Sequence, residues 1–181
     1  VSMQDRYLNE YVFLGQKYAF KVCRVEPENN IAMILEAFYD YKLLPVVVVG
    51  NWSNSHYGLR LKEKHEKDSN IYFLDPIYDQ NKIDLLRSNC YVYIHGHSAG
   101  GTNPSLVEAM CLQLPIIAFD VNFNRETTHN KCLYFYSKQQ LIGKLENLSD
   151  DTRLKNAENM KSIADQCYKW DIVSNLYMNL F

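Results

Sequence analysis

The chain has 181 residues, enough for one domain with a sizeable core. Hydrophobic residues make up 47% and charged residues 22%, with a formal net charge of −2, so the composition is that of a globular protein without a basic footprint for nucleic acid. We expect no signal peptide, and no apolar run reaches the roughly 18 residues that a membrane-spanning helix needs. Five cysteines without CxxC spacing favour reduced thiols and a cytoplasmic setting over a zinc knuckle or a redox pair.

Predicted strands and helices alternate along the chain, after a mixed segment, Ser2–Gln16, that ends in a glycine turn. The clearest strand is PVVVVG, because an uninterrupted β-branched run that stops at glycine is typical of a strand covered on both faces. The predicted strands are Tyr18–Arg24, Pro45–Gly50, Ile71–Leu74, Cys90–Ile94, Pro115–Phe119 and Leu133–Tyr136. The predicted helices are Ile31–Tyr41, His56–Glu66, Gln80–Arg87, one beginning at Pro104, Gln139–Leu148, Asp151–Tyr168 and Trp170–Phe181.

This alternation predicts an α/β fold: a single Rossmann-like, doubly wound, parallel six-stranded sheet with helices on both faces. We expect a lead-in over residues 1–17, the sheet domain over 18–168 and a C-terminal helix over 169–181. Ligands of such sheets bind beyond the carboxyl ends of the strands, at the point where the strand order reverses. The residues that directly follow each strand are therefore the candidates for function.

The stretch IHGHSAGGTNPSLVEAM, residues 94–110, predicts a strand, a glycine turn and a helix start. Gly100 and Gly101 permit positive φ and close approach of a ligand to the backbone. Asn103 is a favoured N-cap residue, and Pro104 suits the first helical position. Such a turn directs several N–H groups to one spot at the positive end of a helix, which suits a phosphate.

Glu108 lies one helical turn beyond Pro104 on the same face. A carboxylate there does not bind phosphate, but it accepts hydrogen bonds from the hydroxyls of a ribose attached to that phosphate. The competing interpretation is a solvated acid near a helix start, where the helix dipole favours negative charge.

Three polar residues follow the first predicted strand. Arg24 is placed to bind a diphosphate bidentately, or equally to pair with a carboxylate at the surface. Asn29 and Asn30 are candidates for sugar hydroxyls, or they only form the turn before the next helix.

Other strand ends supply weaker candidates. The turn Asp75–Tyr78 is predicted either to pack against a nucleobase or to serve as a simple strand-to-helix turn. His95 and His97 share one face of an extended segment, but no third ligand with suitable spacing supports zinc, so a histidine that hydrogen-bonds a sugar is preferred, with a structural histidine as the alternative. Arg125 and Glu126 either face the ligand or pair with each other.

Two stretches carry a resemblance to a known family: CRVEPENNIAMILEAF, residues 23–38, and HSAGGTNPSLVEAMCLQLPIIAFDV, residues 97–121. They resemble the C-terminal domain of retaining GT-B glycosyltransferases of the glycogen-synthase-like and bacterial mannosyltransferase family. RVEPENN together with HGHSAGGTNPSLVEAM is similar to a bacterial polysaccharide subgroup that includes rhamnosyltransferases.

The resemblance implies a role for each matching position. Glu108 would bind the donor ribose, Arg24 would contact the donor diphosphate, the backbone of 101–104 would cradle phosphate and sugar, and residues 75–77 would hold the base. The candidate catalytic residues are thus Arg24 and Glu108. The candidate donor-binding residues are Asn29, Asn30, Asp75, Pro76, Ile77, His97, Gly100, Gly101, Thr102 and Asn103.

The sequence departs from the family pattern at two positions. Gly100 stands where the first glutamate of the family's motif is expected, and Asn29 stands where the diphosphate lysine is expected. The contacts to the donor sugar must therefore differ, which is consistent with a deoxy sugar. Without that lysine, stabilisation of the leaving diphosphate by positive charge depends more on Arg24.

The implied activity is transfer of a sugar, with rhamnose as one option, from a nucleoside-diphosphate sugar to a glycan or lipid-linked acceptor with retention, in bacterial surface polysaccharide biosynthesis. Neither a metal nor another cofactor is expected. The expected partners are the nucleotide sugar, the acceptor and an N-terminal acceptor domain, without which we expect binding but no turnover. Nucleic acid is not expected, and peripheral contact with the inner face of the membrane would come through the other domain. The alternatives are a non-catalytic nucleotide-binding module and a sugar-nucleotide epimerase.

Overall fold

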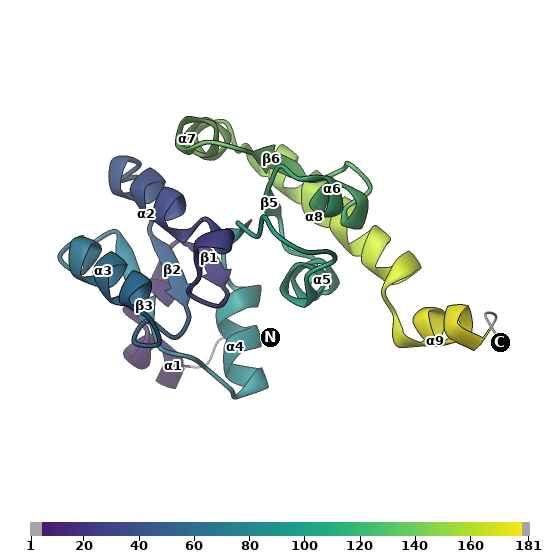
Figure 1. Ribbon diagram of the computed structural model, residues 1–181, viewed down its shortest axis with the longest axis horizontal. Helices are drawn as coiled ribbons and strands as arrows, with labels where there is room; N and C mark the ends of the chain where they lie inside the picture. The colour runs from purple at the N-terminus through teal and green to yellow at the C-terminus, as the bar shows by residue number, and fades with distance from the viewer. Residues whose placement is uncertain (1–4, 179–181) are drawn as a thin grey trace.

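The computed structural model describes residues 5–178, which form one parallel six-stranded sheet with helices around it (Figure 1). The strand order is β3-β2-β1-β4-β5-β6, so the direction of winding reverses between β1 and β4. The predicted doubly wound α/β fold is confirmed. The strands are β1 Ala19–Val22, β2 Val46–Val49, β3 Ile71–Leu74, β4 Val92–His95, β5 Ile116–Phe119 and β6 Leu133–Phe135.

Helices cover both faces of the sheet. One face packs against α2 (Ile31–Asp40), α3 (His56–His65) and α7 (Lys138–Glu146). The opposite face packs against α4 (Gln80–Ser88), α5 (Pro104–Cys111) and α8 (Asp150–Cys167). The remaining helical segments are α1 Asp5–Glu10, η1 Val12–Gly15, η2 Pro27–Asn29, α6 Asn122–Thr127 and α9 Trp170–Met178.

The valine run of β2 explains why the centre of the sheet is stable. All four valines are buried; Val47 and Val49 join the core cluster on one face, whereas Val46 and Val48 join the cluster on the other. Successive strand residues point to opposite faces, so an apolar run without alternation fills two cores at once. The predicted cover on both faces is confirmed.

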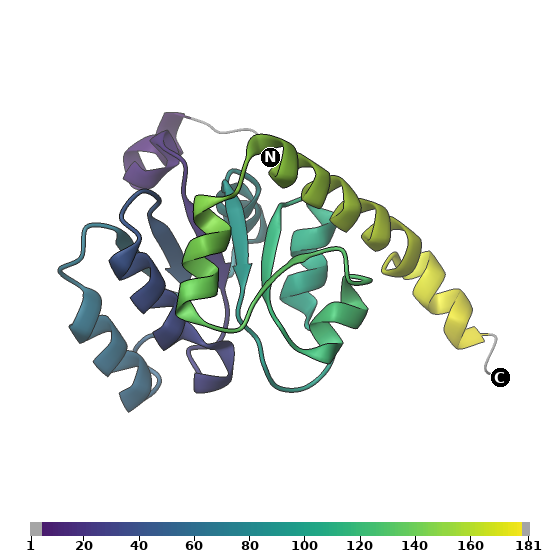
Figure 2. The same cartoon turned by 90° about the horizontal axis from the view of Figure 1, so that it is seen from above.

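The two ends of the described chain differ in how they contact the sheet domain. Phe13 and Leu14 of η1 are buried, and the Phe13 ring lies 5.1 Å from that of Tyr18, so residues of the predicted lead-in contribute to the domain core. At the other end, α8 runs obliquely along the sheet domain and α9 projects beyond it (Figure 2). Trp170, the first residue of α9, is 85% exposed. Residues 179–181 of the predicted last helix lie outside the described residues.

The segment after β5 differs from the expectation. It forms the short helix α6, because the buried Asn124 side chain donates hydrogen bonds to the carbonyls of Phe119 and His97, 2.9 Å each, and holds the turn against the sheet. Of the two alternatives for Arg125, pairing with Glu126 is wrong, because Arg125 Nη2 donates to Asp120 Oδ2 at 2.7 Å. Of the helices within residues 5–178, none combines the length and the hydropathy that a membrane crossing requires.

Candidate functional site

A pocket of about 300 Å³ lies where β1 and β4 end, at the point where the strand order reverses. Five of the predicted site residues share its wall, although they are separated by up to 84 positions in the sequence (24 to 108). The pocket therefore lies where the fold class places a ligand. Its lining residues are Val22, Cys23, Arg24, Asn29, Arg87, His97, Asn103, Pro104, Ser105 and Glu108.

A second hollow of about 280 Å³ adjoins the first, because both are lined by Val22, Cys23 and Arg24. Its other walls come from the ends of β2 and β3, and they include Gly50, Pro76 and Ile77. The two hollows together run along the carboxyl edge of the sheet. They offer an extended ligand one half-polar and one mainly apolar compartment.

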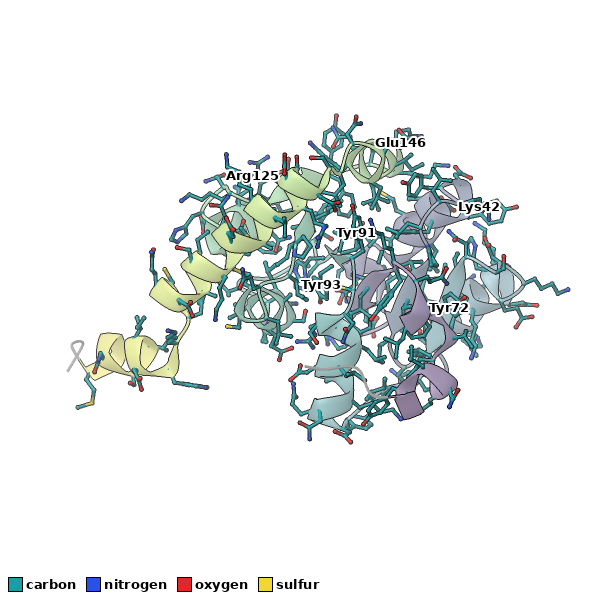
Figure 3. The ribbon with its side chains drawn as sticks, turned by 180° about the vertical axis from the view of Figure 1, so that it is seen from behind. Lys42, Tyr72, Tyr91, Tyr93, Arg125 and Glu146 are labelled. Carbon is teal, nitrogen blue, oxygen red and sulfur yellow. The ribbon has the colours of Figure 1, made fainter. Side chains whose placement is uncertain are left out.

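Two larger hollows lie elsewhere, at about 540 and 510 Å³. The first lies between β6 and α7 and includes Arg125; the second lies at the amino edge of the sheet and includes Tyr91 (Figure 3). The guanidinium of Arg125 is already engaged by Asp120, and the amino edge of a parallel sheet is not where its ligands bind. Volume alone is therefore a poor guide here, and the paired hollows are the better candidate site.

The start of α5 has the predicted form. Asn103 has extended backbone angles, and its Oδ1 accepts hydrogen bonds from the Ser105 backbone N–H at 3.0 Å and from Ser105 Oγ at 2.7 Å. Pro104 occupies the first helical position, and Gly100 has φ +103°, which favours glycine. The N-terminus of α5, which is the positive end of its helix dipole, therefore forms part of the pocket wall through Asn103, Pro104 and Ser105.

Not every predicted residue reaches the hollows. The tip of the turn, 100–102, is exposed and lines neither of them. Asp75 is exposed as well, whereas its neighbours Pro76 and Ile77 line the second hollow. Asn30 lines neither, because its backbone is left-handed at φ 51° and its Nδ2 donates to the Gly96 carbonyl at 2.8 Å. The side chain of Asn30 therefore joins two loops instead of facing a ligand.

Glu108 lies in the pocket wall with its side chain 50% exposed. Its Oε2 accepts a hydrogen bond of 2.7 Å from Arg87 Nη1, and Arg87 itself is 3% exposed. Sequence reasoning missed Arg87. The visible signal was a basic residue in the last turn of a helix, which is common at helix ends. The ion pair is a contact across 21 positions that local pattern does not reveal.

Arg24 is the exposed cation of the site. It stands at the shared rim of the two hollows with its side chain 78% exposed, and its Nη2 lies 3.8 Å from Glu28 Oε1. An ion pair of this length and exposure contributes little, so the guanidinium stays available to an anion.

The loops after β1 and β4 are joined by several hydrogen bonds. The backbone N–H and the hydroxyl of Ser98 both donate to the Glu28 carbonyl, at 2.8 and 2.9 Å. With the Asn30 to Gly96 bond, these contacts fix the distance between the two strand ends. Hydrogen bonds from one backbone N–H and two side chains therefore join the two loops that frame the pocket.

His97 has a definite tautomer. Asn29 Nδ2 donates to the Arg24 carbonyl at 2.9 Å, so Asn29 Oδ1 is an acceptor, and it faces His97 Nδ1 at 3.2 Å. His97 Nδ1 must then carry the proton, and Nε2 is left as an acceptor. Burial, reinforced by the positive charge of Lys21, lowers the pKa of His97, so the ring is neutral near pH 7.

Buried histidines predict a loss of stability in mild acid. Burial lowers the pKa of His65 and His97 and lowers that of His95 well below its usual value. The unfolded chain takes up protons on these rings near pH 6.5, but the folded chain does not, so the unfolded state binds more protons as the pH falls. We expect the free energy of unfolding, measured in urea, to fall by roughly 2 kcal/mol from pH 7 to pH 5. His95→Gln should flatten this slope, and an unchanged slope would contradict the assignment.

His95 and His97 do share one side of the strand end, with ring centroids 6.2 Å apart. Within the part of the chain that the structure describes, no group of three or more His, Cys, Asp or Glu side chains is arranged to hold a metal ion. The His95 ring instead lies 6.3 Å from the buried Tyr93 ring, which Figure 3 labels in the middle of the molecule, and the His97 ring lies 5.9 Å from that of Phe123.

Known structures share this fold. The C-terminal domain of LpcC, a glycosyl transferase group 1 family protein from Francisella tularensis, superposes with a TM-score of 0.71 at 22% identity, covering 84% of this chain and 87% of that one. Sucrose-phosphate synthase from Thermosynechococcus elongatus gives 0.78 at 16% identity, covering 93% and 46%. The UDP-forming α,α-trehalose-phosphate synthase from Burkholderia vietnamiensis gives 0.76 at 13% identity, covering 96% and 46%. The chain thus spans about half the length of the two synthases.

None of the curated proteins compared with the chain matches it. Likeness at these identities shows the fold alone. The family is shown by a sequence model, described as glycosyl transferases group 1, which matches residues 4–166 and so covers most of the chain. The chain therefore belongs to the group 1 glycosyl transferase family.

Proposed function

We propose that this chain is the donor-binding domain of a glycosyltransferase and that the paired hollows bind a nucleoside-diphosphate sugar. One observation carries the proposal: in a chain of this family, an exposed arginine, a helix N-terminus and a half-exposed glutamate meet around one pocket where the strand order reverses. These are the groups that a diphosphate joined to a ribose requires.

The proposed ligand runs along both hollows. Its base lies in the mainly apolar compartment beside Pro76 and Ile77, and its ribose hydroxyls donate to Glu108. Its diphosphate lies between Arg24 and the start of α5, where a cation and the helix dipole stabilise the charge that develops as the glycosidic bond breaks. No step of this scheme requires a metal ion or another cofactor.

The sugar end of the ligand would meet His97. A glutamate at position 100 is disfavoured by the left-handed backbone of Gly100, so the family's usual acid does not fit this turn. A Cβ atom at that position would lie 3.6 Å from His97 Nε2, the ring nitrogen that does not face Asn29. We propose that His97 accepts a hydrogen bond from a sugar hydroxyl near the place where that acid would otherwise begin.

The donor sugar, the stereochemistry and the acceptor are proposed from the family resemblance of residues 23–38 and 97–121. We propose that the sugar, with rhamnose as the first candidate, is transferred with retention to a glycan or lipid-linked acceptor held by an N-terminal domain. The reaction would take place in the cytoplasm during polysaccharide synthesis, with contact to the inner membrane face made by that other domain. The chain by itself should bind nucleotide without catalysing transfer.

The test is calorimetric titration of the chain with UDP, GDP, ADP and CDP. We expect one of them to bind, and Glu108→Ala to weaken its binding by about tenfold or more through loss of charge-assisted hydrogen bonds. Glu158→Ala, a change of another exposed glutamate on α8, is the matched control and should leave affinity unchanged.

Glu108→Ala also removes the partner of the buried Arg87, so its melting temperature must be measured in parallel. Glu108→Gln retains hydrogen-bonding capacity and should weaken binding less. If none of the four nucleotides binds to the folded chain, or if Glu108→Ala binds as tightly as the original, the proposal is wrong.

A second candidate, a non-catalytic nucleotide-binding module, is favoured by Gly100 alone, since it stands where the family's first acid is expected. That function predicts normal nucleotide binding without transfer even in a two-domain protein. A screen of nucleotide sugars against such a protein separates the two, and epimerised donor in the absence of acceptor would indicate an epimerase.

A further inference from the structure

We infer that Arg87 is the residue that positions Glu108 for the donor ribose, and that it acts on ribose recognition through its contact with that carboxylate. The inference rests on the proposed function, because it concerns the same pocket. It assigns a task to a buried arginine that neither composition nor helical pattern singles out.

The geometry of the pair is asymmetric. The side chain of Arg87 is 4% exposed and that of Glu108 is 50% exposed, yet their Nη1 and Oε2 atoms are 2.7 Å apart. A buried guanidinium is strongly driven to keep its carboxylate, whereas a half-exposed glutamate would otherwise sample several rotamers in water. The arginine therefore fixes the glutamate more than the glutamate fixes the arginine.

Competition from other partners of Arg87 is weak. The nearest other carboxylate, Asp84 Oδ1, lies at 4.0 Å from Nη1, which is too long for a hydrogen bond. Arg87 Nε is buried without a hydrogen-bond partner among the described residues. The Glu108 contact is therefore the main compensation for the charge of Arg87, and it directs the carboxylate along one line.

The remaining capacity of Glu108 faces the pocket. An ionised carboxylate has about four lone-pair sites, and Arg87 occupies one of them on Oε2. Both residues line the 300 Å³ pocket together with Ser105. Oε1 and the second lone pair of Oε2 are then left for the two adjacent hydroxyls of a ribose, with the side chain already in place.

This arrangement predicts how Arg87 acts on affinity. A carboxylate that is already fixed in the folded protein loses little conformational entropy when the ligand binds. The gain in binding free energy is therefore confined to the hydrogen bonds that the carboxylate accepts from the ribose. Loss of Arg87 should weaken the binding of ligands that carry both ribose hydroxyls more than the binding of ligands that lack them. An ion pair with a merely structural role would change stability without changing that difference.

The experiment compares the tightest of UDP, GDP, ADP and CDP with its 2′,3′-dideoxy counterpart by calorimetry. Ribose dependence is the ratio of the two dissociation constants, and we expect about tenfold or more for the original chain. Arg87→Met should reduce the ratio to about threefold or less, and the ratio isolates the ribose because any change in attraction for the diphosphate acts on both ligands. In a Glu108→Ala background, Arg87→Met should have no further effect on the ratio.

Two further variants keep the test interpretable. Arg125→Met removes another arginine–carboxylate pair, outside this pocket, and should leave the ratio unchanged. If Arg87→Met fails to fold, as judged by circular dichroism, Arg87→Lys takes its place; an ammonium lacks the planar fork, so the ratio should still fall by about threefold.

The outcomes are distinct. An unchanged ratio in Arg87→Met overturns the inference and leaves the proposed function intact. Tighter ribonucleotide binding in that variant also overturns it, because Arg87 would then compete with the ribose for Glu108. Absence of nucleotide binding by the original chain overturns the proposed function and this inference together.

Discussion

Replacing Gly96 with alanine should lower the free energy of unfolding by roughly 3 kcal/mol, because the backbone approaches this residue too closely for a side chain. A Cβ atom there would overlap the Asn29 carbonyl oxygen, and it would lie 2.7 Å from Ile34 Cδ1 and 3.0 Å from Lys21 Nζ. Gly96 and Lys21 are both buried, so neither can move into solvent. Urea denaturation of the two proteins measures the difference.

Gly101→Ala is the matched control, because a Cβ atom at Gly101 meets nothing within 4 Å. Its effect on the free energy of unfolding should stay within about 0.5 kcal/mol. Gly96→Ala should also weaken nucleotide binding, since the Asn30 to Gly96 hydrogen bond fixes the two loops that frame the pocket. A Gly96→Ala protein as stable as the original would show that the loops yield readily and that the pocket is not held open by them.

The fold could be predicted from sequence because its strongest signals are local. The β2 run is apolar throughout, and Asn103 followed by Pro104 marks a helix start that the structure reproduces. Element boundaries moved by one or two residues, as expected where helix ends and strand ends depend on tertiary contacts. The short helix α6 was missed because Asn124 is held by the His97 carbonyl, a partner 27 positions away.

The candidate site could be predicted only in part, for the same reason. Arg24 and Glu108 could be chosen from their positions after a strand and within a helix turn. Arg87 could not, because its importance comes from burial and from a partner on another helix. Asn30 illustrates the same point: it follows the first strand as Arg24 does, but its side chain donates to the Gly96 carbonyl, a contact that the sequence does not reveal.

The double variant Arg24→Ala, Glu108→Ala should weaken binding of the tightest-binding nucleoside diphosphate by about 100-fold, which corresponds to about 2.7 kcal/mol. Each change should cost about tenfold, because a charge-assisted hydrogen bond is lost in each case. The two side chains are proposed to contact different parts of the ligand, the diphosphate and the ribose, so their effects should add. Calorimetry on the double variant and both single variants measures the sum.

Arg60→Ala, Glu158→Ala is the matched control, since it removes one exposed cation and one exposed anion from helices outside the pocket. Salt provides an independent check on the assignment of Arg24. The Arg24 side chain is 78% exposed, so raising the salt concentration should screen its charge and weaken nucleotide binding by the original chain. Arg24→Ala should show a smaller salt dependence of binding. A double variant that binds no more weakly than Glu108→Ala alone, with an unchanged salt dependence, would mean that the diphosphate is held by the main chain at the start of α5 and not by Arg24.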